Sequence, residues 1–144
     1  MPPEAPGGAP PAKLSLVVFS GDFERVHYAL ALASSMLAVG RQATLFFTMG
    51  AIRGLLRARD DGTPGWHALP GATRDATFAR EGLATFEELL SACVELGAAF
   101  MVCEMGLKAE GLARADLRPD VRIVEGGIVT FLNDARADGA MMML

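Results

Sequence analysis

Apolar runs of five or six residues alternate along this chain with stretches in which apolar residues recur every three or four positions. Residues 14–19 form the first run and predict a β-strand. The following stretch predicts an amphipathic helix, because its apolar positions are spaced by four, three and four: Val26, Leu30, Ala33 and Leu37. Gly40 comes next, and a glycine at this place favours the left-handed turn that closes a helix.

The same alternation continues through the middle of the chain. Residues 43–47 predict a second strand, and residues 51–57 predict a short helix. Thr85 and Glu88 have the spacing of a capping box, which predicts a helix that begins there and runs to Gly97.

The last third of the chain completes the pattern. Residues 98–102 predict a third strand, residues 121–124 a fourth and residues 140–144 a fifth. A helix is expected at 127–135, with one apolar face formed by Ile128, Phe131, Leu132 and Ala135. The first three strands are nearly continuous in apolar residues, which is typical of strands covered on both faces. The predicted fold is therefore a three-layer α/β/α sandwich with a mainly parallel sheet of about five strands.

Two segments do not fit this alternation. Residues 58–82 hold several glycines and prolines together with Trp66 and His67, and predict a long loop. Loops of more than ~12–15 residues are usually functional or disordered, so this one is interpreted as a lid or oligomer contact, or else as a floppy insertion. Residues 1–12 are rich in proline and glycine and predict a disordered tail, which leaves 13–144 as a single domain.

Composition narrows the classes of function. The chain has 144 residues, enough for one compact domain, and a net charge of −4, so neither nucleic acid nor an anionic membrane is an expected partner. Its longest apolar stretch falls short of the ~20 residues that span a bilayer. With two cysteines and 51% hydrophobic residues it needs no disulfide, which indicates a reducing cytoplasm. No cofactor or metal is expected, because the turns lack nucleotide-binding motifs and the histidines lack partners at ligand spacing.

Cys103 is the candidate catalytic residue, because it lies between the third predicted strand and a helix-like segment that begins at Glu104. The first amides of a helix stabilise a thiolate, whereas the adjacent Glu104 carboxylate favours the neutral thiol. His27 and His67 are candidates for a base that deprotonates it. Cys93 lies in the apolar stripe of a helix and is interpreted as a packing residue.

A binding rim is expected around Cys103, since ligands of parallel sheets bind beyond the carboxyl ends of the strands. The ends of the first four predicted strands each carry glycine, and exposed amides there suit an anionic group such as a persulfide or sulfite. The candidate ligand-binding residues are Ser20, Gly21, Thr48, Gly50, Glu104, Met105, Gly106, Gly126 and Gly127. The alternative is that these turns contain glycine only for their geometry.

Taken together, these segments resemble the DsrE/DsrF-like family over roughly residues 13–144. The resemblance is carried by residues 14–20, by the 45–50 strand and turn, by the helix that runs into residues 100–105, and by the 126–132 helix. Its most specific part is the Cys-Glu/Gln-Met-x turn, matched here by residues 103–106. Many related turns continue with a second polar or Met-rich stretch, and this chain departs from them there.

The resemblance implies a small α/β protein, often a trimer or hexamer, that carries sulfane sulfur as a persulfide in sulfur relay or sulfur oxidation. Cys103 would bear the persulfide, and the partners would be sulfur donor and acceptor proteins. Eight methionines and the high apolar content also favour a homo-oligomer, with residues 141–144 as an interface strand. The alternatives are a non-enzymatic small-ligand binding or assembly module with a structural Cys103, and a thiol peroxidase.

Overall fold

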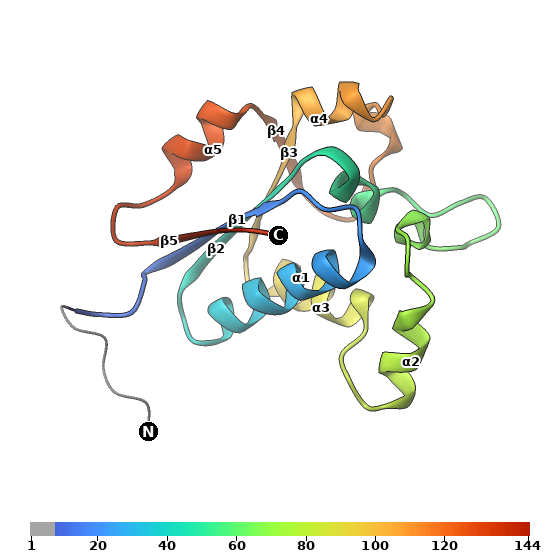
Figure 1. Ribbon diagram of the computed structural model, residues 1–144, viewed down its shortest axis with the longest axis horizontal. Coiled ribbons are helices and arrows are strands. Elements are labelled where there is room, and N and C mark those ends of the chain that lie inside the picture. Colours follow the sequence, from blue (N-terminus) through green and yellow to red (C-terminus); the bar gives the residue numbers. More distant parts are fainter. Residues whose placement is uncertain (1–7) are drawn as a thin grey trace.

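A computed structural model of the protein describes residues 8–144, and it shows a five-stranded parallel sheet between two layers of helices (Figure 1). The strand order is β4-β3-β2-β1-β5, and all four neighbouring pairs are parallel. The strands are β1 (Lys13–Val18), β2 (Gln42–Phe47), β3 (Ala99–Cys103), β4 (Ile123–Gly126) and β5 (Ala140–Met143). This is the α/β sandwich that the apolar runs predict. Residues 1–7 of the predicted tail lie outside the described residues.

Helices alternate with these strands along the chain. The α-helices are α1 (Phe23–Ala38), α2 (Arg74–Arg80), α3 (Phe86–Glu95), α4 (Glu104–Ala109) and α5 (Ile128–Asp134). Three 3₁₀ helices are η1 (Met49–Leu55), η2 (Gly65–Ala68) and η3 (Arg114–Asp116). The predicted capping box is present, since the Thr85 side chain accepts from the Glu88 amide and the Glu88 side chain accepts from the Thr85 amide. Gly40 has the expected left-handed conformation, with φ at 82°.

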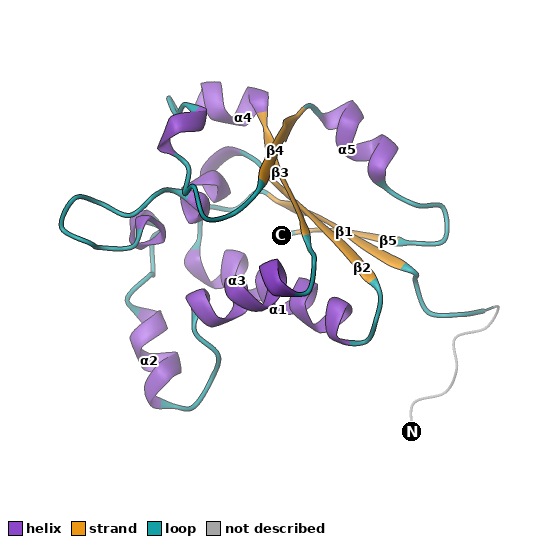
Figure 2. Cartoon of the chain, turned by 180° about the vertical axis from the view of Figure 1, so that it is seen from behind, coloured by secondary structure: helices purple, strands orange, loops and turns teal. Residues whose placement is uncertain are grey.

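The main core lies on the face of the sheet that α1 and α3 cover (Figure 2). Alternate strand residues point into it, such as Leu14, Leu16 and Val18 of β1. The apolar face predicted for α1 is also largely buried there, since Val26, Leu30 and Ala33 are all inaccessible to solvent. Burial of this kind stabilises a fold by roughly 25 cal/mol per Å² of apolar surface, which makes this face the principal source of stability.

The opposite face is covered more thinly: within residues 8–144, α5 is the one α-helix that lies over its centre (Figure 1). Its core cluster consists of Phe46, Met101, Cys103 and Phe131. The aromatic rings of Phe46 and Phe131 stack with centroids 4.8 Å apart. This second, smaller core contains the candidate catalytic residue.

Four predicted elements differ from the structure. The 51–57 helix is the 3₁₀ helix η1, and the fourth strand begins at Ile123 rather than at residue 121. The predicted 58–82 loop contains η2 and α2, although α2 buries none of its residues. In α5 the expected apolar face is mostly exposed, because only Phe131 is buried while Ile128 and Leu132 are each about half exposed. No second layer lies over that side of α5 in the described chain.

Candidate functional site

Cys103 is the last residue of β3 and the residue directly before α4. The apolar side chains that precede it are buried in the sheet, and α4 begins at Glu104 without any side-chain cap. The strand-to-helix junction predicted from the sequence is therefore present. The unpaired first amides of a helix favour negative charge, so the backbone at this position suits an anionic sulfur.

The Cys103 side chain is buried, with 1% of its surface exposed. It lies on the α5 face of the sheet, among the side chains of Phe46, Met101 and Phe131. These apolar side chains exclude water from the Cys103 sulfur. A reagent therefore reaches this thiol only when the covering side chains move.

Helix α5 is fixed over this cluster at its carboxyl end by a polar anchor. Lys13 Nζ donates to Asp134 Oδ2 at 2.8 Å and to the Asp134 carbonyl at 3.0 Å, and Thr44 Oγ1 donates to the same carboxylate at 2.7 Å. Burial by itself raises the pKa of Asp134, but the hydrogen bonds from Lys13 and Thr44 outweigh it and lower that pKa. The carboxylate is thus held in its charged form, and it ties α5 to β1 and β2.

Two of the predicted rim glycines pack against each other. A Cβ built on Gly21 would lie 3.2 Å from the backbone of Gly50, and one built on Gly50 would lie 3.1 Å from Cα of Gly21. The absence of side chains therefore lets the turn after β1 approach the turn after β2. These two glycines allow close packing, which agrees with the alternative that the turns contain glycine only for their geometry.

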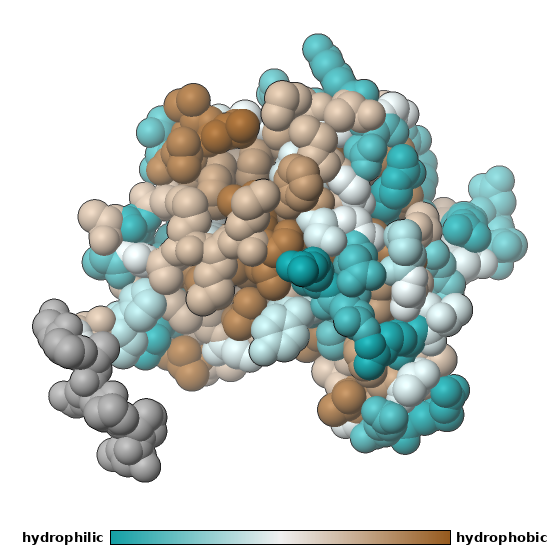
Figure 3. Space-filling view, viewed as in Figure 1, coloured by the Kyte–Doolittle hydropathy of each residue, from teal (hydrophilic) through white to brown (hydrophobic). Residues whose placement is uncertain are grey.

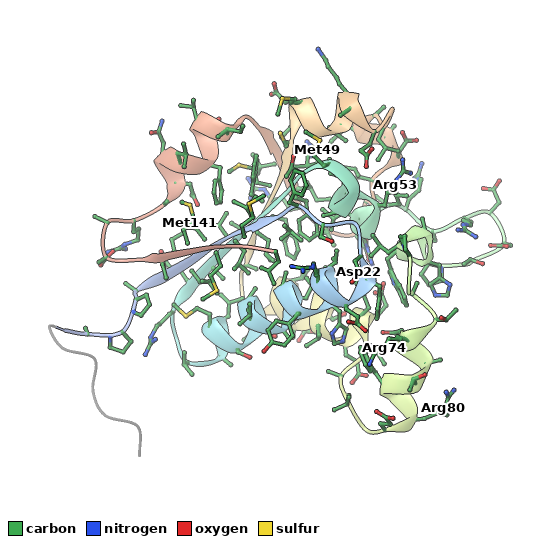
Figure 4. All side chains as sticks on the ribbon, in the orientation of Figure 1. Asp22, Met49, Arg53, Arg74, Arg80 and Met141 are labelled. Carbon is green, nitrogen blue, oxygen red and sulfur yellow. The ribbon has the colours of Figure 1, made fainter. Side chains whose placement is uncertain are left out.

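Gly106 also occupies a crowded place. A Cβ there would lie 2.7 Å from the backbone nitrogen of Met49 and 2.9 Å from Oγ1 of Thr48. Met49 has a positive φ of 48°, a left-handed conformation that is uncommon for residues other than glycine. Figure 4 shows Met49 in the turn after β2, where η1 begins, on the side of the molecule where α4 lies. Gly106 lets α4 contact this turn directly.

The remaining predicted rim residues fall into different environments. Gly126 is buried against Thr130 and Met101, whereas a Cβ on Gly127 would have no atom within 4 Å. Glu104 and Met105 are exposed, and the Ser20 hydroxyl accepts a hydrogen bond from the Asp22 amide. The strand ends come together as expected, but most of their glycines contact protein atoms. Binding of an anion at this rim stays a prediction.

The two histidines lie away from Cys103. Nε2 of His27 is 2.8 Å from the Ala84 carbonyl, and its ring packs against Phe78 on the α1 side of the sheet. His67 packs against Trp66 on η2. Because the Cys103 side chain lies on the α5 side, neither histidine is placed to act as its base.

Cys93 has the packing role expected from its helical stripe. Its side chain is fully buried in the main core, and its thiol donates to the Leu30 carbonyl at 3.4 Å. Burial raises the pKa of the Cys93 thiol to about 12. Both cysteines are free, and they lie on opposite faces of the sheet.

Two sets of long-range contacts had no clear signal in the sequence. Asp134 is one acidic residue in a polar stretch, and its partner Lys13 is 121 positions away. The segment that contains Trp66 is fixed by Glu87, whose carboxylate accepts hydrogen bonds from the Trp66 indole and from Arg118. These bonds, the Arg118 bond above all, lower the pKa of Glu87. Such contacts join distant segments, and periodicity alone does not reveal them.

Within residues 8–144, no group of three or more histidine, cysteine, aspartate or glutamate side chains could hold a metal ion. In the same range, no helix is long and apolar enough to cross a membrane.

Comparison with known proteins shows the fold but not the family. No protein-family model matches the chain, and no curated protein matches it in sequence. Among solved structures, it resembles MTH1491 from Methanobacterium thermoautotrophicum, a protein of unknown function, with 14% identity and a TM-score of 0.61. It also resembles the ychN protein from E. coli, with 12% identity and a TM-score of 0.59. Each comparison covers 92% of this chain and 98% of the other.

Proposed function

We propose that this protein is a sulfur carrier that holds sulfane sulfur as a persulfide on Cys103, within a cytoplasmic sulfur relay or sulfur oxidation pathway. The observation that carries the proposal is the place of this thiol: it ends an interior strand of a parallel sheet and directly precedes an uncapped helix. Ligands of such sheets bind at this edge. The Cys-Glu-Met-Gly turn, which resembles the DsrE/DsrF-like family, gives independent support.

The proposed transfer is redox-neutral and needs no cofactor. The Cys103 thiolate attacks the outer sulfur of a donor persulfide, the sulfur–sulfur bond of the donor breaks, and the donor leaves as a thiolate. An acceptor thiolate then attacks the outer sulfur on Cys103, and the Cys103 thiolate is released. The rate of each step depends on the thiolate fraction of the attacking group and on the pKa of the leaving thiol.

Access to Cys103 requires α5 to move, because the thiol is buried beneath this helix. Gly126 and Gly127 precede α5, and Gly127 has open space around it, so this junction is suited to act as a hinge. When α5 is closed, the apolar cluster around Cys103 keeps water and competing thiols from the bound sulfur. Donor and acceptor proteins would bind with α5 displaced.

Assembly into a homo-oligomer such as a trimer or hexamer is part of the same proposal. Five exposed side chains, here called the α5–β5 surface, gather on one side of the molecule: Ile128, Val129, Leu132, Met141 and Met143. Figure 3 shows this apolar area over α5 and β5, and Figure 4 places Met141 on β5 within it. Each of these side chains is between 48% and 69% exposed, which favours a protein partner, and a second copy is the simplest one.

A non-enzymatic assembly module is the second candidate, and the 1% exposure of Cys103 is the observation that favours it. In that case the thiol only packs against Phe46 and Phe131. A thiol peroxidase has less support, because Cys93, its one resolving partner within the chain, lies on the other face of the sheet. Intact mass after treatment with a sulfane-sulfur donor separates these functions, since only the carrier gains one sulfur on Cys103.

A further inference from the structure

Four arginines line one cavity at the β4 edge of the molecule. One of them precedes Cys103 in the sequence, and the other three follow α4. This arginine cavity has a volume of about 490 Å³ and is lined by Arg57, Arg114, Arg118 and Arg122, with Leu117 and Val121 among its apolar residues. Small-molecule sites commonly have volumes of ~300–1,000 Å³. No motif or periodicity in the sequence predicts that these arginines lie together.

The backbone fixes the two segments that carry these arginines. The Arg57 amide donates to the Asp116 carbonyl at 2.9 Å, and the Arg118 amide donates to the Leu55 carbonyl at 2.9 Å. An antiparallel bridge joins Leu56 to Leu117 between these bonds. The walls of the cavity therefore hold their positions without a ligand, which reduces the entropic cost of binding.

The charges in the cavity are unbalanced. Arg118 is neutralised by Glu87 and Asp120, both of which accept its hydrogen bonds. Arg114 donates to the Ile123 carbonyl and lies 3.9 Å from the Glu125 carboxylate. In the described part of the chain, Arg57 and Arg122 have no ion-pair partner, and no acidic side chain lines the cavity. Two unmatched positive charges thus face one space in a protein whose net charge is −4.

We propose that the arginine cavity binds a small phosphate monoester that has an apolar part. A guanidinium matches phosphate oxygens with paired N–H donors, and two unpaired arginines balance the two negative charges of the monoester. The buried side chains of Leu117 and Val121 provide an apolar wall for the rest of the molecule. This proposal rests on geometry and charge outside the Cys103 site, so it is independent of sulfur transfer.

Phenyl phosphate is a direct test, because it joins a dianionic phosphate to an apolar ring. We expect calorimetric titration to show binding by the wild-type protein at low salt. Arg57→Gln and Arg122→Gln should each weaken that binding about tenfold, since each removes a charge-assisted hydrogen bond. Arg80→Gln is the matched control: Arg80 is an exposed arginine of α2, outside the cavity, and its loss should leave the dissociation constant unchanged (Figure 4).

Three results would overturn the proposal. The first is no binding of phenyl phosphate at millimolar concentration by a folded wild-type protein. The second is equal weakening by Arg80→Gln, which would indicate attraction by the overall charge and not by a site. The third is equally tight binding of malonate, which would show that two carboxylates suffice and that phosphate is not selected. Because Arg57 and Arg122 are exposed, both variants should fold, and unchanged thermal melting would verify it.

Discussion

The ring of Phe131 in α5 stacks on the ring of Phe46 in β2, with centroids 4.8 Å apart and planes inclined by 16°. Both rings belong to the cluster that contains Cys103, and Phe131 is the only buried residue of its helix. This one aromatic contact therefore closes α5 over the thiol. It connects the packing of the second core to the chemistry proposed for Cys103.

Removing the aromatic ring should make Cys103 accessible. In Phe131→Ala the cavity left beneath α5 should lower the free energy of unfolding by about 3 kcal/mol. It should also raise the rate of Cys103 alkylation about tenfold, because the free energy needed to open α5 would fall by about 1.4 kcal/mol. Alkylation followed by mass spectrometry in a Cys93→Ser background measures this rate at one site.

Asn133→Ala provides the control for this experiment, because Asn133 lies on the same helix, is exposed and lies outside the α5–β5 surface. Its alkylation rate should equal that of the wild type. An unchanged rate in a folded Phe131→Ala protein would show that α5 does not control access to Cys103.

The anchor of α5 should make the stability depend on pH. The pKa of Asp134 is lowered in the folded protein, so its charged form contributes stability above the pKa of the unfolded state, about 3.9. That contribution is lost as the pH falls through the lower folded pKa. Asp134→Asn should therefore cost about 1 kcal/mol at pH 7, after allowance for partial exposure, and much less at pH 3.

Thermal melting of both proteins at pH 7 and pH 3 measures this difference. Asp60→Asn, a change of an exposed carboxylate in the 58–82 segment, controls for the loss of one charge. A penalty for Asp134→Asn that is the same at both pH values would contradict the role assigned to its charge.

The close contact of α4 with the turn after β2 depends on Gly106. Gly106→Ala would bring a Cβ within 2.7 Å of the Met49 nitrogen, which should reduce the free energy of unfolding by about 2 kcal/mol. Gly127→Ala is the matched control, because its new Cβ meets no atom within 4 Å and its φ of −95° suits alanine. Its effect should stay within about 0.5 kcal/mol. Denaturant unfolding of both variants tests this, and equal stability would refute the contact.

The sequence was sufficient to predict the alternation of strands and helices, because strands buried on both faces leave long apolar runs. It also placed Cys103 correctly, since the end of such a run adjoins a helical segment. It failed for α5, where Ile128 and Leu132 are exposed. Periodicity shows which residues share a face, but it does not show whether another element covers that face.

The glycines of the rim illustrate a second limit. The sequence located Gly21 and Gly50 at strand ends, but only the folded chain shows that their backbones contact each other. The same holds for Lys13 and Asp134, whose ion pair joins the two ends of the domain. Contacts between distant segments depend on how the layers pack, and local patterns carry little information about them.

The α5–β5 surface should hold copies of the chain together. Met143→Lys replaces an apolar side chain that is 65% exposed with a charged one. Because burying that charge between two copies is unfavourable, the variant should shift the protein toward the monomer in sedimentation velocity. Val39→Lys is the matched control, because Val39 is also an apolar residue with 65% exposure but lies at the end of α1, outside the α5–β5 surface. This variant should not alter assembly. A wild-type protein that sediments as a monomer would remove the oligomer from the proposal.

The most direct test of the central claim is the intact mass of the protein after incubation with a small-molecule persulfide. The wild type and Cys93→Ser should each gain one sulfur atom, while Cys103→Ser should gain none. An added acceptor thiol should then remove the sulfur. If Cys103→Ser still gains sulfur, or if no variant gains it although Phe131→Ala leaves Cys103 open to alkylation, the carrier function is contradicted and Cys103 is a packing residue.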